Sequence, residues 1–321
     1  MADAKGPVIV LGVRRSGTTL LRVILDRSPS VAIPDESYFV PQLAARHRGP
    51  IDADAFADDL SRIGTLSDWD VDVREVRARL RDGMTTGDAI AAAFETYAAG
   101  RGKDRWGDKT PMYMQYLPML ERLFPQALYV HLIRDGRDAA TSFLAMPGGI
   151  VTETWAHPRT PADFACQWRT EVEAARALGS RVGPGRYQEV RYEALVADPK
   201  QRVEAVCEFA GLSYDEEMLA YASDPSLGRK PHQQRLQQPP TPGVRNWRRE
   251  LSPSDAMAFE DVAGLLLTEL GYSLSTGEPH APSLHARARL ASYRVRSAAW
   301  RQAGGLLQRS PLWRRRHPVR V

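Results

Sequence analysis

Short apolar runs alternate along the chain with longer segments in which apolar residues recur every three or four positions. Residues 8–11 (V-I-V-L) and 128–133 (L-Y-V-H-L-I) are almost entirely apolar, which is typical of parallel strands buried on both faces. Residues 31–34 and 187–191 are two weaker strand candidates. Because the candidate strands alternate with segments of helical periodicity, the pattern predicts an open α/β sheet.

The helical segments follow from the same pattern. A helix is expected over residues 16–26, with apolar residues on its inward side and Pro29 just beyond its end. Further helices are expected over residues 112–124, 138–144, 162–177, 199–210 and 252–270. Residues 40–100 are expected to be mostly helical, and residues 146–161 and 223–243 to be loops. In a sheet of this kind, ligands bind at the carboxyl ends of the strands.

The fold class expected from this order is α/β, a three-layer, P-loop-like fold with a central parallel sheet flanked by helices. The chain has 321 residues, of which 43% are hydrophobic and 26% charged, an ordinary globular composition. It has no run of about 18 apolar residues and no apolar segment at its start, so neither a membrane span nor a secretory signal is expected. The two cysteines, Cys166 and Cys207, lack metal-ligand spacing. These observations favour a cytoplasmic location.

Basic residues are concentrated at the C-terminus. The whole chain carries a net charge of +4, but residues 279–321 contain ten arginines and no acidic residue, so residues 1–278 carry −6. We therefore expect an α/β domain over residues 1–278 and an Arg-rich extension over residues 279–321. The pI of 9.1 reflects this extension and does not indicate nucleic-acid binding.

Three interpretations of the Arg-rich extension are open. It can be an amphipathic segment on an anionic membrane surface, a dock for an acidic acceptor, or an extension packed on the domain. Gly304, Gly305 and Pro311 are expected to interrupt any single helix there. A membrane-peripheral location and a homodimer are therefore kept as open alternatives.

The segment G12-V-R-R-S-G-T-T directly follows the first predicted strand. Its two glycines have the spacing of a phosphate-binding loop, G-x-x-x-x-G-K-[ST], in which backbone N–H groups and a helix N-terminus hold an anion. Thr18 stands where that loop has its lysine, and Thr19 occupies the position of the Mg²⁺ ligand. The loop therefore favours an anion that is bound by cationic side chains without a metal, and a phosphosulfate fits this description.

Four segments together resemble the family of sulfotransferases that depend on 3′-phosphoadenosine 5′-phosphosulfate (PAPS). They are V10-L-G-V-R-R-S-G-T-T-L-L-R, W106-G-D-K-T-P, V130-H-L-I-R-D-G-R-D-A-A-T-S and V190-R-Y-E-A-L-V-A-D-P. The resemblance extends over roughly residues 7–270, and the spacing is most similar to the tyrosylprotein-sulfotransferase-like branch. It implies PAPS as the co-substrate, a hydroxyl acceptor and no metal.

The resemblance also implies three catalytic residues. Glu36 is expected to be the base for the acceptor hydroxyl, because it lies 21 residues beyond Arg15, as in that branch. A shift of one residue in the alignment would give this role to Asp35. Arg15 and Lys109 are expected to stabilise the charge that develops during transfer.

A set of cofactor contacts follows from the same resemblance. The loop residues expected to hold the 5′-phosphosulfate are Arg14, Arg15, Ser16, Gly17, Thr18 and Thr19. The residues expected near the 3′-phosphate and the nucleotide are Arg134, Ser142, Tyr192, Arg245 and Trp247. Arg14 is equally well interpreted as a loop arginine in solvent. Asn246 stands where the family commonly has a basic residue before the tryptophan, so either Arg245 or Arg248 is a candidate for the nucleotide contact.

Other polar residues of the second and third segments have simpler interpretations. Arg134 with Asp135, and Arg137 with Asp138, are interpreted as local ion pairs, which would leave Asp135, Arg137 and Asp138 without a catalytic role. His131 lies in the middle of a predicted strand and is interpreted as a core histidine rather than a base.

We therefore expect a sulfotransferase that moves the sulfuryl group of PAPS to a hydroxyl acceptor by in-line transfer. The acceptor classes left open are small molecules, glycans, lipids and tyrosine-like phenols, and the acceptor would lie among residues 40–100, 146–161 and 223–243. Two alternatives also stay open. One is a P-loop kinase or NTPase that requires Mg²⁺ and a nucleoside triphosphate, and the other is a nucleotide-binding scaffold without catalysis.

Overall fold

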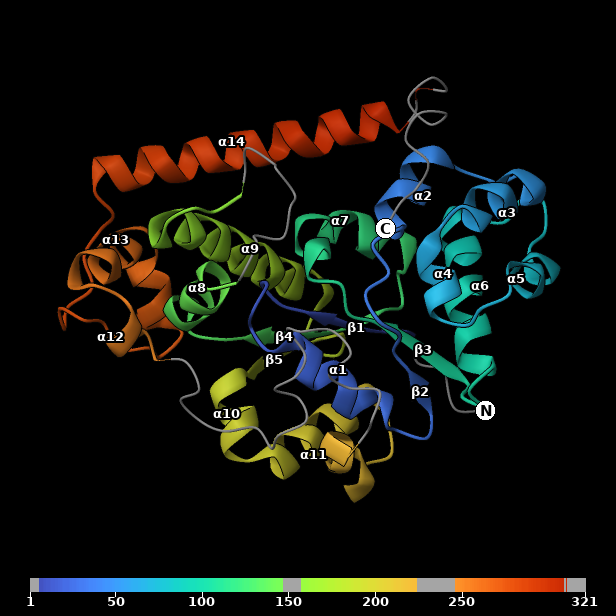
Figure 1. Ribbon diagram of the computed structural model, residues 1–321, viewed down its shortest axis with the longest axis horizontal. Helices are drawn as coiled ribbons and strands as arrows, with labels where there is room; N and C mark the ends of the chain where they lie inside the picture. Colours follow the sequence, from blue (N-terminus) through green and yellow to red (C-terminus); the bar gives the residue numbers. More distant parts are fainter. Residues whose placement is uncertain (1–5, 147–156, 224–245, 309, 311–321) are drawn as a thin grey trace.

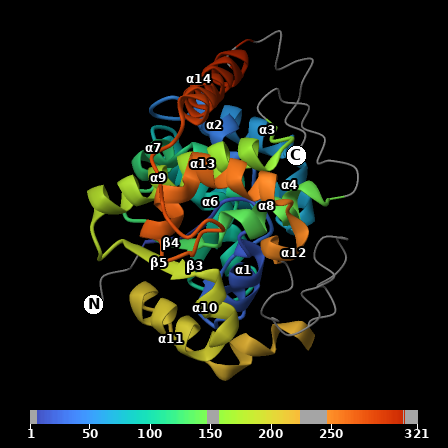
Figure 2. The same cartoon turned by 90° about the vertical axis from the view of Figure 1, so that its left-hand side faces the viewer.

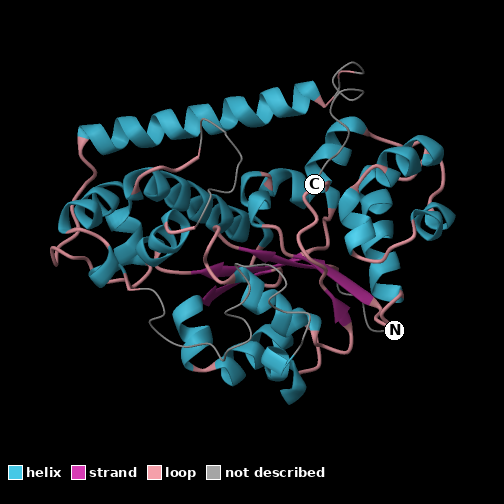
Figure 3. Cartoon of the chain, in the orientation of Figure 1, coloured by secondary structure: helices cyan, strands magenta, loops and turns pink. Residues whose placement is uncertain are grey.

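The computed structural model describes residues 6–146, 157–223, 246–308 and 310. Five parallel strands form one sheet in the order β2-β3-β1-β4-β5, with helices on both faces (Figures 1 and 3). The strands are β1 (Val8–Leu11), β2 (Val31–Ala32), β3 (Arg105–Asp108), β4 (Leu128–Ile133) and β5 (Tyr187–Arg191). The expected three-layer α/β class with a central parallel sheet is confirmed.

Helices form a layer on each side of the sheet (Figure 1). One side carries α1 (Thr18–Asp26), α10 (Tyr192–Ala197), α11 (Pro199–Ala210) and the 3₁₀ segment η2 (Glu216–Ser223). The other elements are α2 (Val40–Arg46), α3 (Ala53–Ser61), α4 (Gly64–Asp68), α5 (Val73–Arg79), α6 (Thr86–Ala99), the 3₁₀ segment η1 (Pro111–Gln115), α7 (Leu117–Leu123), α8 (Gly136–Leu144), α9 (Pro161–Val182), α12 (Trp247–Glu250), α13 (Pro253–Glu269) and α14 (Leu284–Leu307).

The pleat of the central strands divides the interior into two hydrophobic cores. Val8 and Val10 of β1 face the core under α1 and α11, whereas Ile9 and Leu11 face the larger core under α6, α9 and α13. Successive side chains of a strand point to opposite faces. A fully apolar run such as V-I-V-L is therefore required where helices cover both sides.

The structure differs from the sequence-based prediction in two ways around residues 105–124. No element was predicted for residues 105–108, yet they form β3, which lies inside the sheet between β2 and β1. The helix expected over residues 112–124 is divided into η1 and α7, with Tyr116 in a non-helical conformation between them. Pro118 is the cause, because it has no N–H to donate to the carbonyl oxygen of Met114 four residues earlier and its ring clashes with that carbonyl group in a continuous helix.

The expected interruption at Gly304 and Gly305 is also absent, since α14 runs through both glycines to Leu307. Glycine costs a helix only about 1 kcal/mol, and the side-chain contacts of α14 offset that cost. Arg46 of α2 donates to the side-chain oxygen of Gln308 at 3.1 Å and 3.2 Å, which holds the C-terminal end of the helix. No helix in the described part of the chain combines the length and the apolar character needed to cross a bilayer.

The loops expected over residues 146–161 and 223–243 lie mostly outside the described residues. The other predicted helices are found with small shifts in their bounds, except that α9 extends five residues beyond the expected end, to Val182. Residues 40–100 are largely helical, as expected, and form α2 to α6.

Candidate functional site

The candidate site residues follow the carboxyl ends of the strands. Gly12 comes directly after β1, Lys109 after β3, Arg134 after β4 and Tyr192 after β5, while Glu36 lies a few residues beyond β2. Because all five strands are parallel, these ends meet at one edge of the sheet.

Two glycines give the loop between β1 and α1 its tight path. A Cβ atom on Gly12 would lie 2.5 Å from the Thr18 methyl group and 2.8 Å from the Leu132 carbonyl oxygen. Gly17 has φ +89°, and a Cβ atom there would lie 2.4 Å from the ring of Tyr192. The loop therefore needs glycine at both positions, and Tyr192 packs directly on it. The Leu20 N–H donates to the Gly17 carbonyl oxygen at 2.9 Å, whereas the N–H groups of Thr18 and Thr19 precede the first bond of the helix and are available to an anion.

Arg15, Arg134 and Ser142 converge beside this loop. Arg15 has φ +70°, and its Nε donates to Ser142 Oγ at 3.0 Å. Arg134 Nη1 donates to the Arg15 carbonyl oxygen at 3.1 Å, and its guanidinium lies 4.6 Å from the ring of Tyr192. The structure thus brings four of the expected cofactor residues together.

Two buried donors in this group are left without a partner. Arg134 Nε and Ser16 Oγ are both inaccessible to solvent and make no hydrogen bond to the described residues. Burying an unpaired polar group is costly. A ligand with oxygen acceptors at this position would satisfy both.

Glu36 and Lys109 form a second cluster on the β2 and β3 side of the loop. Lys109 Nζ contacts Glu36 Oε1 and donates to Thr19 Oγ1 at 3.3 Å, and Tyr38 Oη contacts Glu36 Oε2. The side chain of Lys109 is 2% exposed, whereas that of Glu36 is 25% exposed. Burial lowers the pKa of Lys109, and the Glu36 carboxylate acts against that shift. Glu36 is therefore a partly accessible carboxylate held by a buried cation.

A buried polar network, not identified from the sequence, fixes this cluster. Ser37 Oγ donates to Asp108 Oδ1 at 3.1 Å and lies 2.7 Å from Tyr113 Oη, while Thr110 Oγ1 donates to the same Asp108 oxygen at 3.2 Å. Burial raises the pKa of Asp108 to about 7. The bonds tie the segment after β2 to the end of β3, so they set the positions of the neighbouring Glu36 and Lys109. The aspartate of W-G-D-K-T-P, Asp108, was the one sequence feature that could have indicated this network.

Asp35 has different surroundings from Glu36. Its Oδ1 accepts a hydrogen bond from Arg22 Nη2 of α1 at 2.8 Å, and the Arg22 side chain is only 10% exposed. Asp35 therefore pairs with the helix that follows the loop, whereas Glu36 pairs with Lys109.

Arg14 lies toward α8 and α9. Its guanidinium is 5.6 Å from the ring of Phe143 in α8. Burial lowers the pKa of His157, and the charge of Arg14 lowers it further. Burial raises the pKa of Glu171 in α9 to about 7, and Arg14 acts against that shift. Arg14 thus interacts with groups on the far side of the loop from Glu36 and Lys109.

The interpretation of Arg134 with Asp135, and of Arg137 with Asp138, as local ion pairs is wrong. Arg137 pairs instead with Asp135 Oδ2 at 2.7 Å and with Glu260 Oε1 at 2.5 Å. Asp138 accepts a hydrogen bond from the Trp247 N–H at 2.8 Å, and burial raises the pKa of Asp138 to about 6. In a helix, residues one apart point in different directions, so Arg137 reaches across to α13.

Two further expectations concern Trp247 and His131. The Trp247 ring is 5% exposed and lies 3.8 Å and 4.3 Å from the guanidinium groups of Arg137 and Arg248, so it packs in this structural cluster. Arg245 lies outside the described residues. His131 is fully buried in β4 with Nδ1 2.6 Å from Tyr187 Oη, and burial lowers its pKa to about 3. The interpretation of His131 as a core residue is confirmed.

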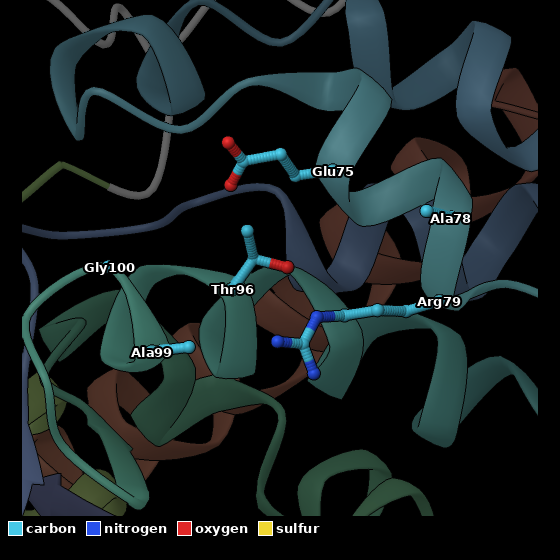
Figure 4. A pocket seen from close by; sticks show the side chains of 6 residues that line it. All are labelled: Glu75, Ala78, Arg79, Thr96, Ala99 and Gly100. Carbon is cyan, nitrogen blue, oxygen red and sulfur yellow. The ribbon is translucent and has the colours of Figure 1, made fainter.

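Two surface hollows lie away from the loop. One, of about 550 Å³, lies between α5 and the end of α6. It is lined by Glu75, Ala78, Arg79, Thr96, Ala99 and Gly100 (Figure 4). The other, of about 320 Å³, lies between the start of α9 and α14 and is lined by His157, Arg159, Asp163, Cys166, Arg289, Tyr293 and Arg296. Neither hollow is lined by residues of the Arg15–Arg134–Ser142 cluster or of the Glu36–Lys109 cluster. The candidate site is therefore defined by these two clusters and not by a hollow. The described residues contain no cluster of three or more His, Cys, Asp or Glu side chains suited to a metal ion.

Comparisons with known proteins give one consistent result. The family model described as "Sulfotransferase family" matches residues 7–216. The nodulation protein NoeE of Sinorhizobium fredii is 30% identical over 296 residues, which cover 83% of this chain and 66% of NoeE. The protein-tyrosine sulfotransferase A of Caenorhabditis elegans is 25% identical over 285 residues, covering 85% of this chain and 69% of that protein. The chain thus spans about two thirds of the length of these relatives.

A solved structure agrees with the match. The sulfotransferase domain of the Synechococcus PCC 7002 olefin synthase superposes with a TM-score of 0.59 at 26% identity. The aligned region covers 85% of this chain and 98% of that domain.

Proposed function

The chain belongs to the sulfotransferase family, and we propose that it transfers the sulfuryl group of PAPS to a hydroxyl acceptor. The observation that carries the proposal is the meeting of two clusters on either side of one anion-binding loop. Arg15, Arg134 and Ser142 lie on one side, and Glu36 and Lys109 lie on the other.

The unpaired donors support a phosphorylated co-substrate. Arg134 Nε and Ser16 Oγ lack partners among the described residues, and Ser142 Oγ accepts from Arg15, which leaves its own hydrogen for an oxygen of the ligand. We assign the 3′-phosphate to Arg134 and Ser142, and the 5′-phosphosulfate to Arg15 and the residues from Ser16 to Thr19. Arg14 belongs to the same loop, but its guanidinium lies 5.6 Å from the ring of Phe143, on the far side of the loop from Glu36, so we assign it no contact with the transferred group.

Glu36 is proposed as the base. Its carboxylate is partly exposed, and its Oε1 contacts Nζ of the buried Lys109. The carboxylate would take the proton of the acceptor hydroxyl, while Lys109 and Arg15 hold developing negative charge. Asp35, the alternative base, is engaged with Arg22, which supports Glu36. PAPS, when bound, supplies the sulfuryl group and leaves as the 3′,5′-bisphosphate (PAP).

The surroundings of Thr19 argue against the kinase alternative. Thr19 holds the position that binds Mg²⁺ in triphosphate loops, but its hydroxyl accepts a hydrogen bond from Lys109. A buried ammonium at this distance would repel a divalent cation. Calorimetry with PAP and with ATP–Mg²⁺ separates the two functions, and we expect binding of PAP.

The base is tested with Glu36→Gln and with Asp35→Asn as the matched neighbour. Turnover of ³⁵S-labelled PAPS with acceptors from a cell extract is expected to fall by about 10²- to 10⁴-fold in Glu36→Gln, while PAP affinity is retained. Asp35→Asn should keep most of its activity. Near-normal turnover in Glu36→Gln together with a large loss in Asp35→Asn would move the base to Asp35. No transfer by the unaltered chain to any acceptor or to water would favour the non-catalytic scaffold.

A further inference from the structure

The outer face of α14 carries an exposed apolar stripe. Its inner face, formed by Ala286, Leu290, Tyr293 and Ser297, is buried and packs toward α9, α13 and α2. On the opposite face Leu284 is 81% exposed, Val295 68% and Leu306 60%. The residues that join these three along the same face are Ala288, Ala291, Ala299 and Gln302, all exposed. Since these positions recur every three or four residues, they form one stripe, which is apolar except at Gln302.

Arginines border the stripe on both sides. Arg287, Arg294 and Arg301 are spaced seven residues apart along one edge, and Arg289 and Arg296 are seven apart along the other. No acidic residue occurs anywhere in α14. The helix therefore combines a narrow apolar face with two rows of positive charge.

Two of the five arginines are already engaged with the body of the protein. Arg289 pairs with Asp163 at 3.1 Å, and Arg294 pairs with Glu173 at 2.5 Å, both in α9. Within the described part of the chain, Arg287, Arg296 and Arg301 have no carboxylate at ion-pair distance. These pairs fix the orientation of the helix, so the apolar stripe is held outward.

The position of α14 leaves this face open. The helix lies as a single straight rod along one side of the molecule, with the sheet between it and α11, and the labelled elements lie on its inner side (Figures 1 and 2). An exposed apolar stripe is a feature that normally marks a contact surface.

We propose that α14 binds the surface of a bilayer that contains anionic lipids. Leu284, Val295 and Leu306 would enter the boundary between headgroups and acyl chains, and the flanking arginines would contact the anionic headgroups.

Charge selects a lipid surface over a second copy of the chain. Two α14 helices packed stripe to stripe would bring arginines close to arginines at both edges, with no acidic residue on either helix to offset them. Like charges across an interface are unfavourable. An anionic bilayer is complementary to both the stripe and its edges. The inference does not depend on the sulfuryl-transfer proposal.

The test is flotation of the full chain with phosphatidylcholine vesicles, with and without phosphatidylglycerol. The chain is expected to float with the anionic vesicles and not with phosphatidylcholine alone, and added salt should weaken binding. Val295→Asp is expected to lower partitioning at least about tenfold, because an apolar side chain is lost from the interface. Arg287→Glu should lower it about tenfold through charge.

Two control variants make the same changes in charge as Val295→Asp and Arg287→Glu, but on the opposite side of the sheet. Gln201→Glu and Arg202→Glu alter exposed positions of α11 and should leave vesicle binding unchanged. All four variants should keep the far-ultraviolet circular dichroism spectrum and the urea unfolding midpoint of the unaltered chain, which shows that they are folded. Absence of binding to anionic vesicles would overturn the proposal, and so would binding that survives both α14 changes. A dimer that Val295→Asp dissociates, detected by sedimentation, would assign the face to a second copy instead.

Discussion

The segment R134-D-G-R-D places two buried arginines three residues apart, and the structure uses them in opposite ways. Arg137 is 1% exposed, donates to Asp135, Glu260 and the Ser273 carbonyl oxygen, and stacks on Trp247. Arg134 donates through Nη1 to the Arg15 carbonyl oxygen and leaves its buried Nε without a partner among the described residues. Arg137 holds α8 to α13, whereas Arg134 has hydrogen-bonding capacity left for a ligand.

The carboxylates differ in the same way. Glu260, the partner of Arg137, is 3% exposed and also accepts from Ser275, so it is enclosed on all sides. Glu36, the partner of Lys109, is 25% exposed. The two clusters differ less in charge than in how completely their groups are paired, and this difference separates a structural ion cluster from a candidate site.

The largest effect on stability is expected for Arg137→Met. Removing this guanidinium leaves Asp135 and Glu260 buried without their cation, which should cost about 3–5 kcal/mol of unfolding free energy. Urea unfolding followed by circular dichroism measures the loss. The matched variant Arg134→Gln should change the unfolding free energy much less and instead weaken PAP binding. Equal destabilisation by both variants would contradict the comparison.

The next largest effect is expected for Arg15→Gln, which changes the candidate site and not the structural ion cluster. Loss of a charge-stabilising donor typically lowers turnover by about 10²- to 10³-fold, or about 3–4 kcal/mol of activation free energy. The unfolding free energy should stay close to that of the unaltered chain, because Arg15 lies in a partly exposed loop. Turnover at saturating PAPS and urea unfolding are measured on the same preparation. A loss of unfolding free energy together with full turnover would show that Arg15 has a structural role, like Arg137.

Local pattern was enough to predict most of the sheet and the order of the helices. Apolar runs gave β1 and β4, and glycine spacing gave the loop, because these features depend on residues adjacent in the chain. The strand β3 was missed because R-W-G-D is short and mixes charged with small residues, so its burial is decided by the strands on either side.

Partnerships between distant segments could not be predicted. Arg137 and Glu260 are 123 residues apart, and nothing in R-D-G-R-D indicates that its second arginine would reach α13. The pairing of Glu36 with Lys109 likewise depends on how β2 and β3 align, and the pairing of Asp35 with Arg22 depends on how α1 packs beside the segment after β2. The family resemblance supplied the candidate residues. Only the geometry separates the polar groups whose hydrogen bonds are all made within the protein from those that have donors left for a ligand.

His131 sharpens the comparison, because it has an unpaired buried nitrogen and yet lies in the core. Its Nε2 has no partner among the described residues, but the ring is neutral, since burial lowers the pKa to about 3. An unpaired nitrogen therefore indicates a ligand site only where the group is charged and lies at the open edge of the sheet. A neutral ring in the core has another consequence, a dependence of stability on pH.

The folded state with neutral His131 binds fewer protons than the unfolded chain between pH 6.5 and about 3. The stability that this group contributes is complete above pH 6.5 and is lost as the pH falls toward about 3, with about 2 kcal/mol lost by pH 5. Unfolding free energies at pH 7 and pH 5 should therefore differ less for His131→Gln than for the unaltered chain. An identical pH dependence in the two proteins would show that His131 titrates normally.

Ser142→Ala is expected to have the smallest effect. It tests the candidate site directly, because the quantity measured is PAP binding. The hydroxyl accepts from Arg15 Nε at 3.0 Å and is assigned to the 3′-phosphate through its own hydrogen. Removing one such bond should weaken PAP binding by about 0.5–1.5 kcal/mol, while AMP, which lacks the 3′-phosphate, should bind unchanged. Thr141→Val is the control, since that hydroxyl donates to the Asp138 carbonyl oxygen inside α8. Equal losses for PAP and AMP in calorimetry would mean that Ser142 acts only by positioning Arg15, and the 3′-phosphate would then depend on Arg134 alone.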